Sequence, residues 1–154
     1  MIFSSLNKNV ALLNKLEGYV EGFQKLNESV STENIGWHIA HSCQVINTIT
    51  NAIVHSDASK AKPKFSGAYY LLLLTNHIPR GKAKAPNIVI PKKSISKAEI
   101  VEEIELAKAN LQTLAATKKN KYFTHPIFGD LDVPKTLRFF NVHTNHHLKI
   151  IRDI

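Results

Sequence analysis

The sequence predicts an all-α protein, a four-helix bundle in which residues 1–154 form one domain. Apolar residues recur at three- and four-residue spacing through four long segments, which is the pattern of amphipathic helices. A proline-rich stretch separates the second segment from the third, so we expect one long crossover there. No strand pattern competes seriously with this interpretation. Each apolar stripe needs partners on two sides, and a four-helix bundle supplies them.

The first two helices follow from this spacing. A first helix is predicted over roughly residues 3–27, and its apolar positions are Leu6, Val10, Leu13, Leu16, Val20, Phe23 and Leu26. A second helix is expected after the Ser31-Thr32 cap region and runs to about His55. Its apolar stripe consists of Ile35, Ile39, Ile46, Ile49 and Ile53.

The crossover and the last two helices are marked by local signals. Residues 56–94 hold four of the six prolines and are expected to be loop-like around a short helix near residues 68–76. Ser96-Lys-Ala-Glu99 then has the form of a capping box that begins the third helix. A loop over residues 122–131 follows that helix. Asp132 can cap the final helix, with Pro134 in its first turn, and this helix is predicted to run to Ile154.

Charge, cysteine content and apolar runs argue against several classes of protein. The net charge is +8, but most lysines lie in turn-like stretches without interleaved aromatic residues, so no nucleic-acid partner is expected. Cys43 is the only cysteine, which excludes an internal disulfide and favours a cytoplasmic location. The start of the chain resembles a helix rather than a signal peptide. The longest apolar run, residues 68–74, is too short to cross a membrane.

Three histidines stand close together in the final helix: His143, His146 and His147. Residues four apart lie on the same side of a helix, so His143 and His147 can reach one metal ion. At about 100° per residue both fall within the apolar stripe, whereas His146 lies at its edge. A single buried histidine is more often a hydrogen-bonded core residue. Two buried histidines in one stripe cost free energy unless the ring nitrogens of both have partners, and one divalent ion bound by both rings provides them.

The third ligand would come from the second helix, which carries His38 and His41. His38 lies at one edge of the apolar stripe, and His41 lies on a mixed face with small neighbours. Periodicity alone does not decide between them. Either residue could equally be a partly exposed polar side chain.

Other catalytic groups have weaker support. The residue after His143 is Thr144, so the glutamate of a His-Glu-x-x-His protease is absent. Cys43 lies within a helix and is expected to be a small core residue rather than a nucleophile. The paired carboxylates of Glu102 and Glu103 are expected on the polar face of the third helix as solvated charges.

Three motifs stand in order along the chain: Trp37-His-Ile-Ala-His41-Ser, His125-Pro-Ile-Phe-Gly129-Asp-Leu and Phe140-Asn-Val-His143-Thr-Asn-His146-His147-Leu. In this order and spacing they resemble the DinB/YfiT-like superfamily of metal-dependent enzymes over the whole chain. The loop motif is similar to a signature of one subfamily. The resemblance implies a DinB-like four-helix bundle with a divalent metal bound by His41, His143 and His147. Zinc and nickel are the favoured ions, and iron is a third candidate.

Three imidazoles leave open positions on such an ion for water or substrate. The resemblance therefore implies a metal-dependent enzyme, a thiol transferase or hydrolase of a small molecule, which would use a low-molecular-weight thiol in the first case. The basic crossover favours an anionic substrate. His125 and His146 are the predicted catalytic residues for proton transfer, with His38 as a further candidate. The alternative is a non-catalytic metal- or ligand-binding bundle. A homodimer is a further expectation.

Overall fold

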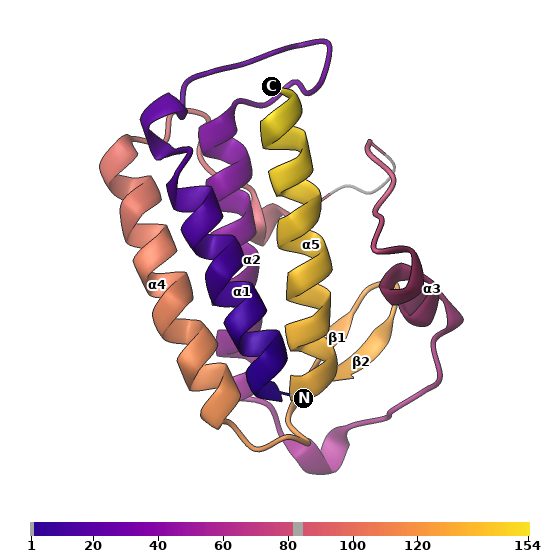
Figure 1. Ribbon diagram of the computed structural model, residues 1–154. Helices are drawn as coiled ribbons and strands as arrows, with labels where there is room; N and C mark the ends of the chain where they lie inside the picture. The colour runs from indigo at the N-terminus through magenta and orange to yellow at the C-terminus, as the bar shows by residue number, and fades with distance from the viewer. Residues whose placement is uncertain (1, 82–84) are drawn as a thin grey trace.

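The computed structural model describes residues 2–81 and 85–154, and within these ranges it contains five α-helices and one β-hairpin (Figure 1). The four long helices are α1 (Ile2–Glu17), α2 (Ile35–Val54), α4 (Lys97–Ala116) and α5 (Val133–Asp153). The crossover between α2 and α4 carries the short helix α3 (Gly67–Thr75). The predicted bundle with a helix in its crossover is therefore confirmed.

The four long helices occupy the corners of the bundle. α1 and α2 each pack against both α4 and α5, so α1 lies diagonally opposite α2 (Figure 1). Leucine and isoleucine side chains fill the centre, where Leu13, Ile39, Ile104 and Leu111 are buried with at most 1% of their surface exposed. α2 and α5 are direct neighbours, so side chains on their facing sides can meet.

The first helix ends at Glu17, well before the predicted residue 27. Backbone carbonyls in the segment after Glu17 instead accept hydrogen bonds from the first amides of α2. The amide of Ile35 donates to the carbonyl of Lys25 at 3.0 Å, and the amide of Gly36 donates to that of Phe23 at 2.7 Å. The first amides of a helix have no acceptor within it, so these contacts stabilise the start of α2. Residues 23–25 make these contacts in place of a longer first helix.

The starts of α4 and α5 agree with the predicted caps. Ser96 and Glu99 form the capping box of α4. The carboxylate of Asp132 accepts from the amide of Lys135 at 2.9 Å at the start of α5, with Pro134 in the first turn. The second helix begins at Ile35 rather than directly after Thr32, because the side chain of Asn34 is its cap and accepts from the amide of Trp37.

The predicted loop over residues 122–131 is instead a β-hairpin. Strands β1 (Tyr122–His125) and β2 (Gly129–Asp132) pair antiparallel, with His125 opposite Gly129 across a three-residue turn. Gly129 has a φ of +72°, a left-handed conformation that favours glycine and closes turns of this length. Strands this short give little alternation in the sequence, which explains why they were not predicted.

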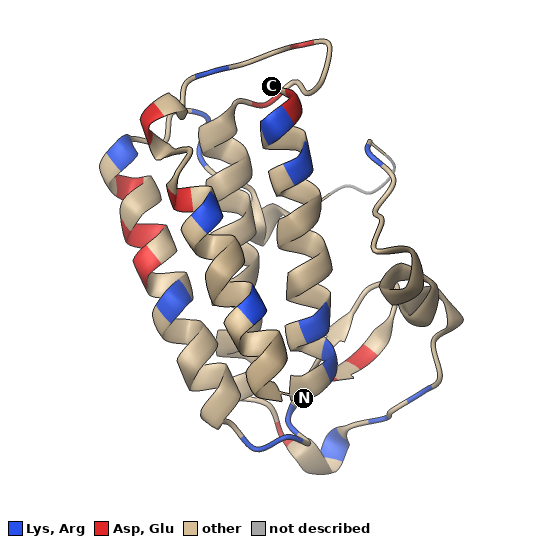
Figure 2. Ribbon diagram, in the orientation of Figure 1, with Lys and Arg blue, Asp and Glu red and all other residues tan. Residues whose placement is uncertain are grey.

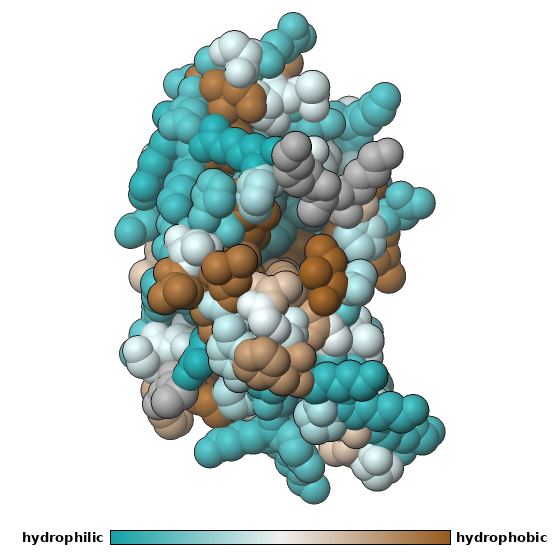
Figure 3. Space-filling model, turned by 90° about the vertical axis from the view of Figure 1, so that its right-hand side faces the viewer, coloured by the Kyte–Doolittle hydropathy of each residue, from teal (hydrophilic) through white to brown (hydrophobic). Residues whose placement is uncertain are grey.

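Charged and apolar side chains are unevenly spread over the surface. Figure 2 shows acidic residues gathered on the first half of α4, while Lys and Arg are distributed over several elements. Glu103 is not simply solvated as predicted, because its carboxylate accepts hydrogen bonds from Gln44 and Asn47 of α2. The side of the molecule that carries the crossover is hollowed near its middle (Figure 3). Exposed apolar side chains of the crossover and hairpin include Phe65, Leu71, Leu74, Ile88 and Ile127.

Among the helices that the structure describes, none combines the length and apolar character needed to cross a membrane.

Candidate metal centre

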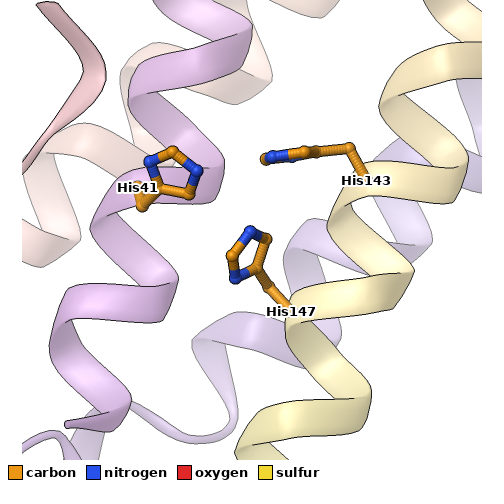
Figure 4. A group of neighbouring side chains, drawn as sticks. All are labelled: His41, His143 and His147. Carbon is orange, nitrogen blue, oxygen red and sulfur yellow. The ribbon is translucent and has the colours of Figure 1, made fainter. Parts of the chain in front are cut away.

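Three histidine side chains from two neighbouring helices point toward one another (Figure 4). His41 extends from α2, and His143 and His147 extend from adjacent turns of α5. Each of the three rings has one nitrogen that lies within 4.8 Å of one nitrogen in each of the other two rings. The structure thus brings together the three residues that the sequence resemblance had grouped, with the α5 pair on the inward face that its helical phase predicted.

Burial keeps these histidines neutral. His41 is 4% exposed and His147 is 7% exposed, while His143 is half-buried. Burial lowers the pKa of His143 and of His147 well below the usual 6.5, and it lowers the pKa of His41 as well. Neutral imidazoles offer lone pairs to a metal at neutral pH without first losing a proton.

The donor set fits a divalent ion. The Nδ1 atom of His143 is buried and has no hydrogen-bond partner. An unsatisfied buried polar atom costs about 1–3 kcal/mol, and coordination through this atom would remove that cost. Two nitrogens on one tetrahedral zinc ion lie roughly 3.3 Å apart, so small ring rotations would close the separations of up to 4.8 Å. Histidine nitrogens suit zinc, nickel and iron alike.

The crossover and Trp37 hold His41 in one orientation. The Nδ1 atom of His41 donates to the carbonyl of Val89, at 2.7 Å, in the 3-10 helix Asn87–Val89 of the crossover. The Nε2 atom of a neutral ring with this tautomer carries the lone pair. The indole of Trp37 stacks on the ring of His41, with ring centroids 4.8 Å apart and planes 16° apart. Sequence patterns gave no sign of the contact with Val89.

His38 lies beside the cluster and contacts it through His147. The Nδ1 atoms of these two residues are 2.9 Å apart, and the Nε2 atom of His38 is 3.0 Å from the hydroxyl oxygen of Ser31. His38 is 4% exposed, and burial is the main cause that lowers its pKa to about 4. The choice between His38 and His41 that periodicity left open is thus answered by geometry: His41 joins the cluster, and His38 supports it.

His146 lines a small pocket next to the cluster. Its ring centroid is 5.1 Å from that of His147. The pocket has a volume of about 60 Å³ and is lined by Asn76, His77, Ile78, Arg80, His146 and Lys149. Burial, followed by the charges of Arg80, His77 and Lys149, lowers the pKa of His146 to about 4. His146 is therefore neutral at neutral pH and a weaker base than an exposed histidine. Its predicted catalytic role stays a prediction.

His125 holds the turn of the hairpin. Its Nδ1 atom accepts from the amides of Ile127 at 3.1 Å and Phe128 at 3.3 Å, and its ring stacks on that of Phe128. Burial lowers its pKa to about 4. Phe139 contacts the rings of both His125 and His143. These contacts give His125 a structural role beside the site, and its predicted catalytic role also stays a prediction.

Cys43 is fully buried among apolar side chains, and burial raises the pKa of its thiol. It is a core residue, as predicted, and its thiol is neutral and shielded from solvent.

Comparison with known proteins agrees with this arrangement. A family model described as the DinB superfamily matches residues 22–151, a span that includes all three clustered histidines and nearly all of the two helices that carry them. No curated protein and no solved structure matches the chain significantly. Because the family model covers most of its length, this chain belongs to the DinB superfamily.

Proposed function

We propose that this protein is a metal-dependent enzyme that transfers a low-molecular-weight thiol to a small molecule or hydrolyses a small molecule. One observation carries the proposal: three neutral histidines converge in a buried site where His143 Nδ1 lacks any hydrogen-bond partner. Such a site binds a divalent ion through His41, His143 and His147. Zinc and nickel suit it best, and iron is a third candidate.

A bound ion would supply Lewis acidity, which lowers the pKa of a water or thiol held against it. The protein's own residues prepare the site for this. The carbonyl of Val89 fixes the ring of His41, and Trp37 covers that ring. The hydrogen bonds of the site among the described residues involve no carboxylate. A proton acceptor would therefore be another group, and His146 is the best placed because it lines the adjacent pocket.

The pocket beside His146 favours an anionic substrate. Arg80 and Lys149 place two cationic side chains at its wall. Arg80 is paired with Asp153 at 2.6 Å, whereas Lys149 donates to the backbone carbonyl of Asn76 at 3.3 Å and has no ion-pair partner in the described part of the chain. A volume of about 60 Å³ suits one carboxylate or a similarly small group. We expect the reacting part of the substrate at the histidines and its acidic group in this pocket.

The motif from His125 to Gly129 supports membership of the DinB subfamily that carries this loop. In this chain the motif builds the hairpin turn, because the histidine accepts two turn amides and the glycine adopts a positive φ. We expect relatives with the motif to share the hairpin.

A second function has specific support. The histidine cluster joins α2 to α5, so a bound ion would cross-link two helices of the bundle. A non-catalytic metal-binding protein would use the ion in this way. Such an ion stabilises the fold by the free energy with which it binds the folded state.

Metal removal separates the two functions. The purified protein is stripped with a chelator, and its melting temperature and turnover are measured with and without added zinc or nickel. Turnover is followed as loss of free thiol in the presence of an epoxide, and as hydrolysis of a small ester. If the protein is an enzyme, the metal-free protein should stay folded, lack turnover, and regain turnover when metal is added. Unfolding on chelation, with no turnover when metal is restored, supports the non-catalytic alternative.

The anionic pocket is tested by Lys149→Ala. This variant should raise KM for an acidic thiol several-fold, with little change in KM for a neutral thiol. The matched control is Lys15→Ala, which removes a lysine from α1 without touching the pocket. An equal KM change for both thiols contradicts the proposed role of the pocket.

A further inference from the structure

The contact between His38 and His147 joins two ring nitrogens of the same kind. Their Nδ1 atoms lie 2.9 Å apart, which is a hydrogen-bond distance. A neutral imidazole has one nitrogen that carries a proton and one that carries a lone pair. Exactly one of the two Nδ1 atoms must therefore hold the proton between them, so the tautomers of the two rings are linked.

Only two arrangements satisfy the contact. In the first, His147 Nδ1 donates to His38 Nδ1, and the Nε2 atom of His38 then carries a proton. In the second, His38 Nδ1 donates, and the Nε2 atom of His147 carries the proton. The rest of His147 lies in the cluster with His41 and His143 (Figure 4), so this second proton would point among the three rings. The first arrangement alone leaves His147 Nε2 with a lone pair for a ligand.

Ser31 provides the acceptor that the first arrangement requires. Its hydroxyl oxygen lies 3.0 Å from His38 Nε2 and already accepts from the amide of Glu33 at 3.1 Å. A hydroxyl oxygen has two lone pairs, so it can accept from both donors. The hydroxyl proton of Ser31 remains free to rotate. A continuous chain of hydrogen bonds thus runs from Ser31 through His38 to His147.

The ring of His38 is held firmly in this chain. Its two nitrogens are bonded on opposite sides, and it is 4% exposed. The indole of Trp37 meets the ring edge-on, with centroids 5.2 Å apart. The same indole stacks on His41, so one side chain contacts both histidines of α2. A turn of His38 away from His147 would therefore break its contacts at both ring nitrogens.

We propose that His38 is a positioning residue of the metal site: it accepts the Nδ1 proton of His147 and so holds His147 in the tautomer that binds metal through Nε2. Ser31 completes this role by accepting the proton of His38 Nε2. The inference rests on the proposed metal site but not on any particular reaction. Hydrogen bonds from neighbouring residues to metal-binding histidines orient the histidine rings, and the loss of such a bond typically lowers metal affinity about 10- to 100-fold.

Metal affinity tests the role directly. Zinc binding is measured by competition with a chromogenic chelator for wild-type protein, His38→Leu and His38→Asn. Leucine fills the space without an acceptor, whereas the amide oxygen of asparagine can still accept near the position of Nδ1. We expect a 10- to 100-fold weaker affinity for His38→Leu and at least partial rescue by His38→Asn. His55→Asn is the matched control, because His55 is an exposed histidine at the opposite end of α2 whose ring donates to the backbone carbonyl of Asn51.

Each outcome has a distinct meaning. Wild-type affinity in His38→Leu overturns the positioning role, and so does an equally weak affinity in both His38 variants. Failure of the wild-type protein itself to bind metal overturns the proposed function as well, so the two failures are distinguishable.

A measurement on unaltered protein keeps the test independent of variant folding. Nitrogen-15 NMR of the zinc-loaded wild-type protein reports which ring nitrogen of each histidine carries a proton. We expect the proton on Nδ1 of His147 and on Nε2 of His38. A proton on Nδ1 of His38 in the loaded protein overturns the proposal.

Discussion

The indole of Trp37 lies nearly parallel to the imidazole of His41, with ring centroids 4.8 Å apart and planes only 16° apart. The two residues are one helical turn apart on α2, so the stack is part of the helix surface that faces the site. Trp37 is also the only tryptophan of the chain. Its fluorescence therefore comes from a single side chain in contact with a candidate metal ligand.

Metal binding should accordingly change tryptophan fluorescence. We expect Co²⁺ or Ni²⁺ to quench the emission of Trp37 in a saturable titration with a one-to-one end point, because such ions quench an indole held close by. His41→Ala should abolish the saturable change. A metal-bound protein, verified by elemental analysis, with unaltered Trp37 emission would contradict placement of the ion at His41.

Acid should destabilise the metal-free protein. Burial lowers the pKa of His38, His125 and His146 from 6.5 to about 4, so between these values the unfolded chain binds protons that the folded chain does not. Their contribution to stability is present above pH 6.5 and is lost as the pH falls toward 4. Urea unfolding at several pH values measures this loss.

His125→Asn isolates one part of this pH effect. Asparagine can still accept from the turn amides that His125 Nδ1 binds, but it does not titrate. The free energy of unfolding of this variant should therefore depend less steeply on pH than that of the wild type. If the free energy of unfolding depended equally on pH in the two proteins, His125 would not contribute to the loss of stability in acid.

A side chain at Gly36 should destabilise the start of α2. A Cβ there would lie 3.0 Å from Ile100 Cδ1 and 3.1 Å from the carbonyl oxygen of Phe23. Gly36→Ala should therefore lower the free energy of unfolding by about 1–3 kcal/mol, although alanine favours helices by about 1 kcal/mol. Gly67→Ala is the control, because its nearest neighbour would be 3.9 Å away. Equal effects of the two changes on thermal unfolding would contradict the close packing.

Part of the site could be predicted from local sequence. The spacing of His143 and His147 and their phase in the apolar stripe of α5 place both rings toward the bundle interior. The caps at Ser96 and Asp132 were predictable for the same reason, because each depends on residues only three positions away. Such signals are contained within one turn of helix.

The rest depends on contacts between distant parts of the chain. Periodicity could not separate His38 from His41, since their roles follow from the position of α5 and from the carbonyl of Val89 in the crossover. The early end of α1 likewise reflects hydrogen bonds that the first amides of α2 donate to the carbonyls of Phe23 and Lys25. The resemblance to the DinB superfamily supplied His41 where the pattern could not.

The metal content of four purified variants tests whether His41, His143 and His147 bind a metal ion. His41→Ala, His143→Ala and His147→Ala each remove one member of the cluster, and His146→Ala removes a neighbour that lies outside it. We predict that wild-type protein and His146→Ala bind one equivalent of divalent metal, whereas each cluster variant loses most of it. Stoichiometric metal in all three cluster variants, or its loss only in His146→Ala, would contradict the site.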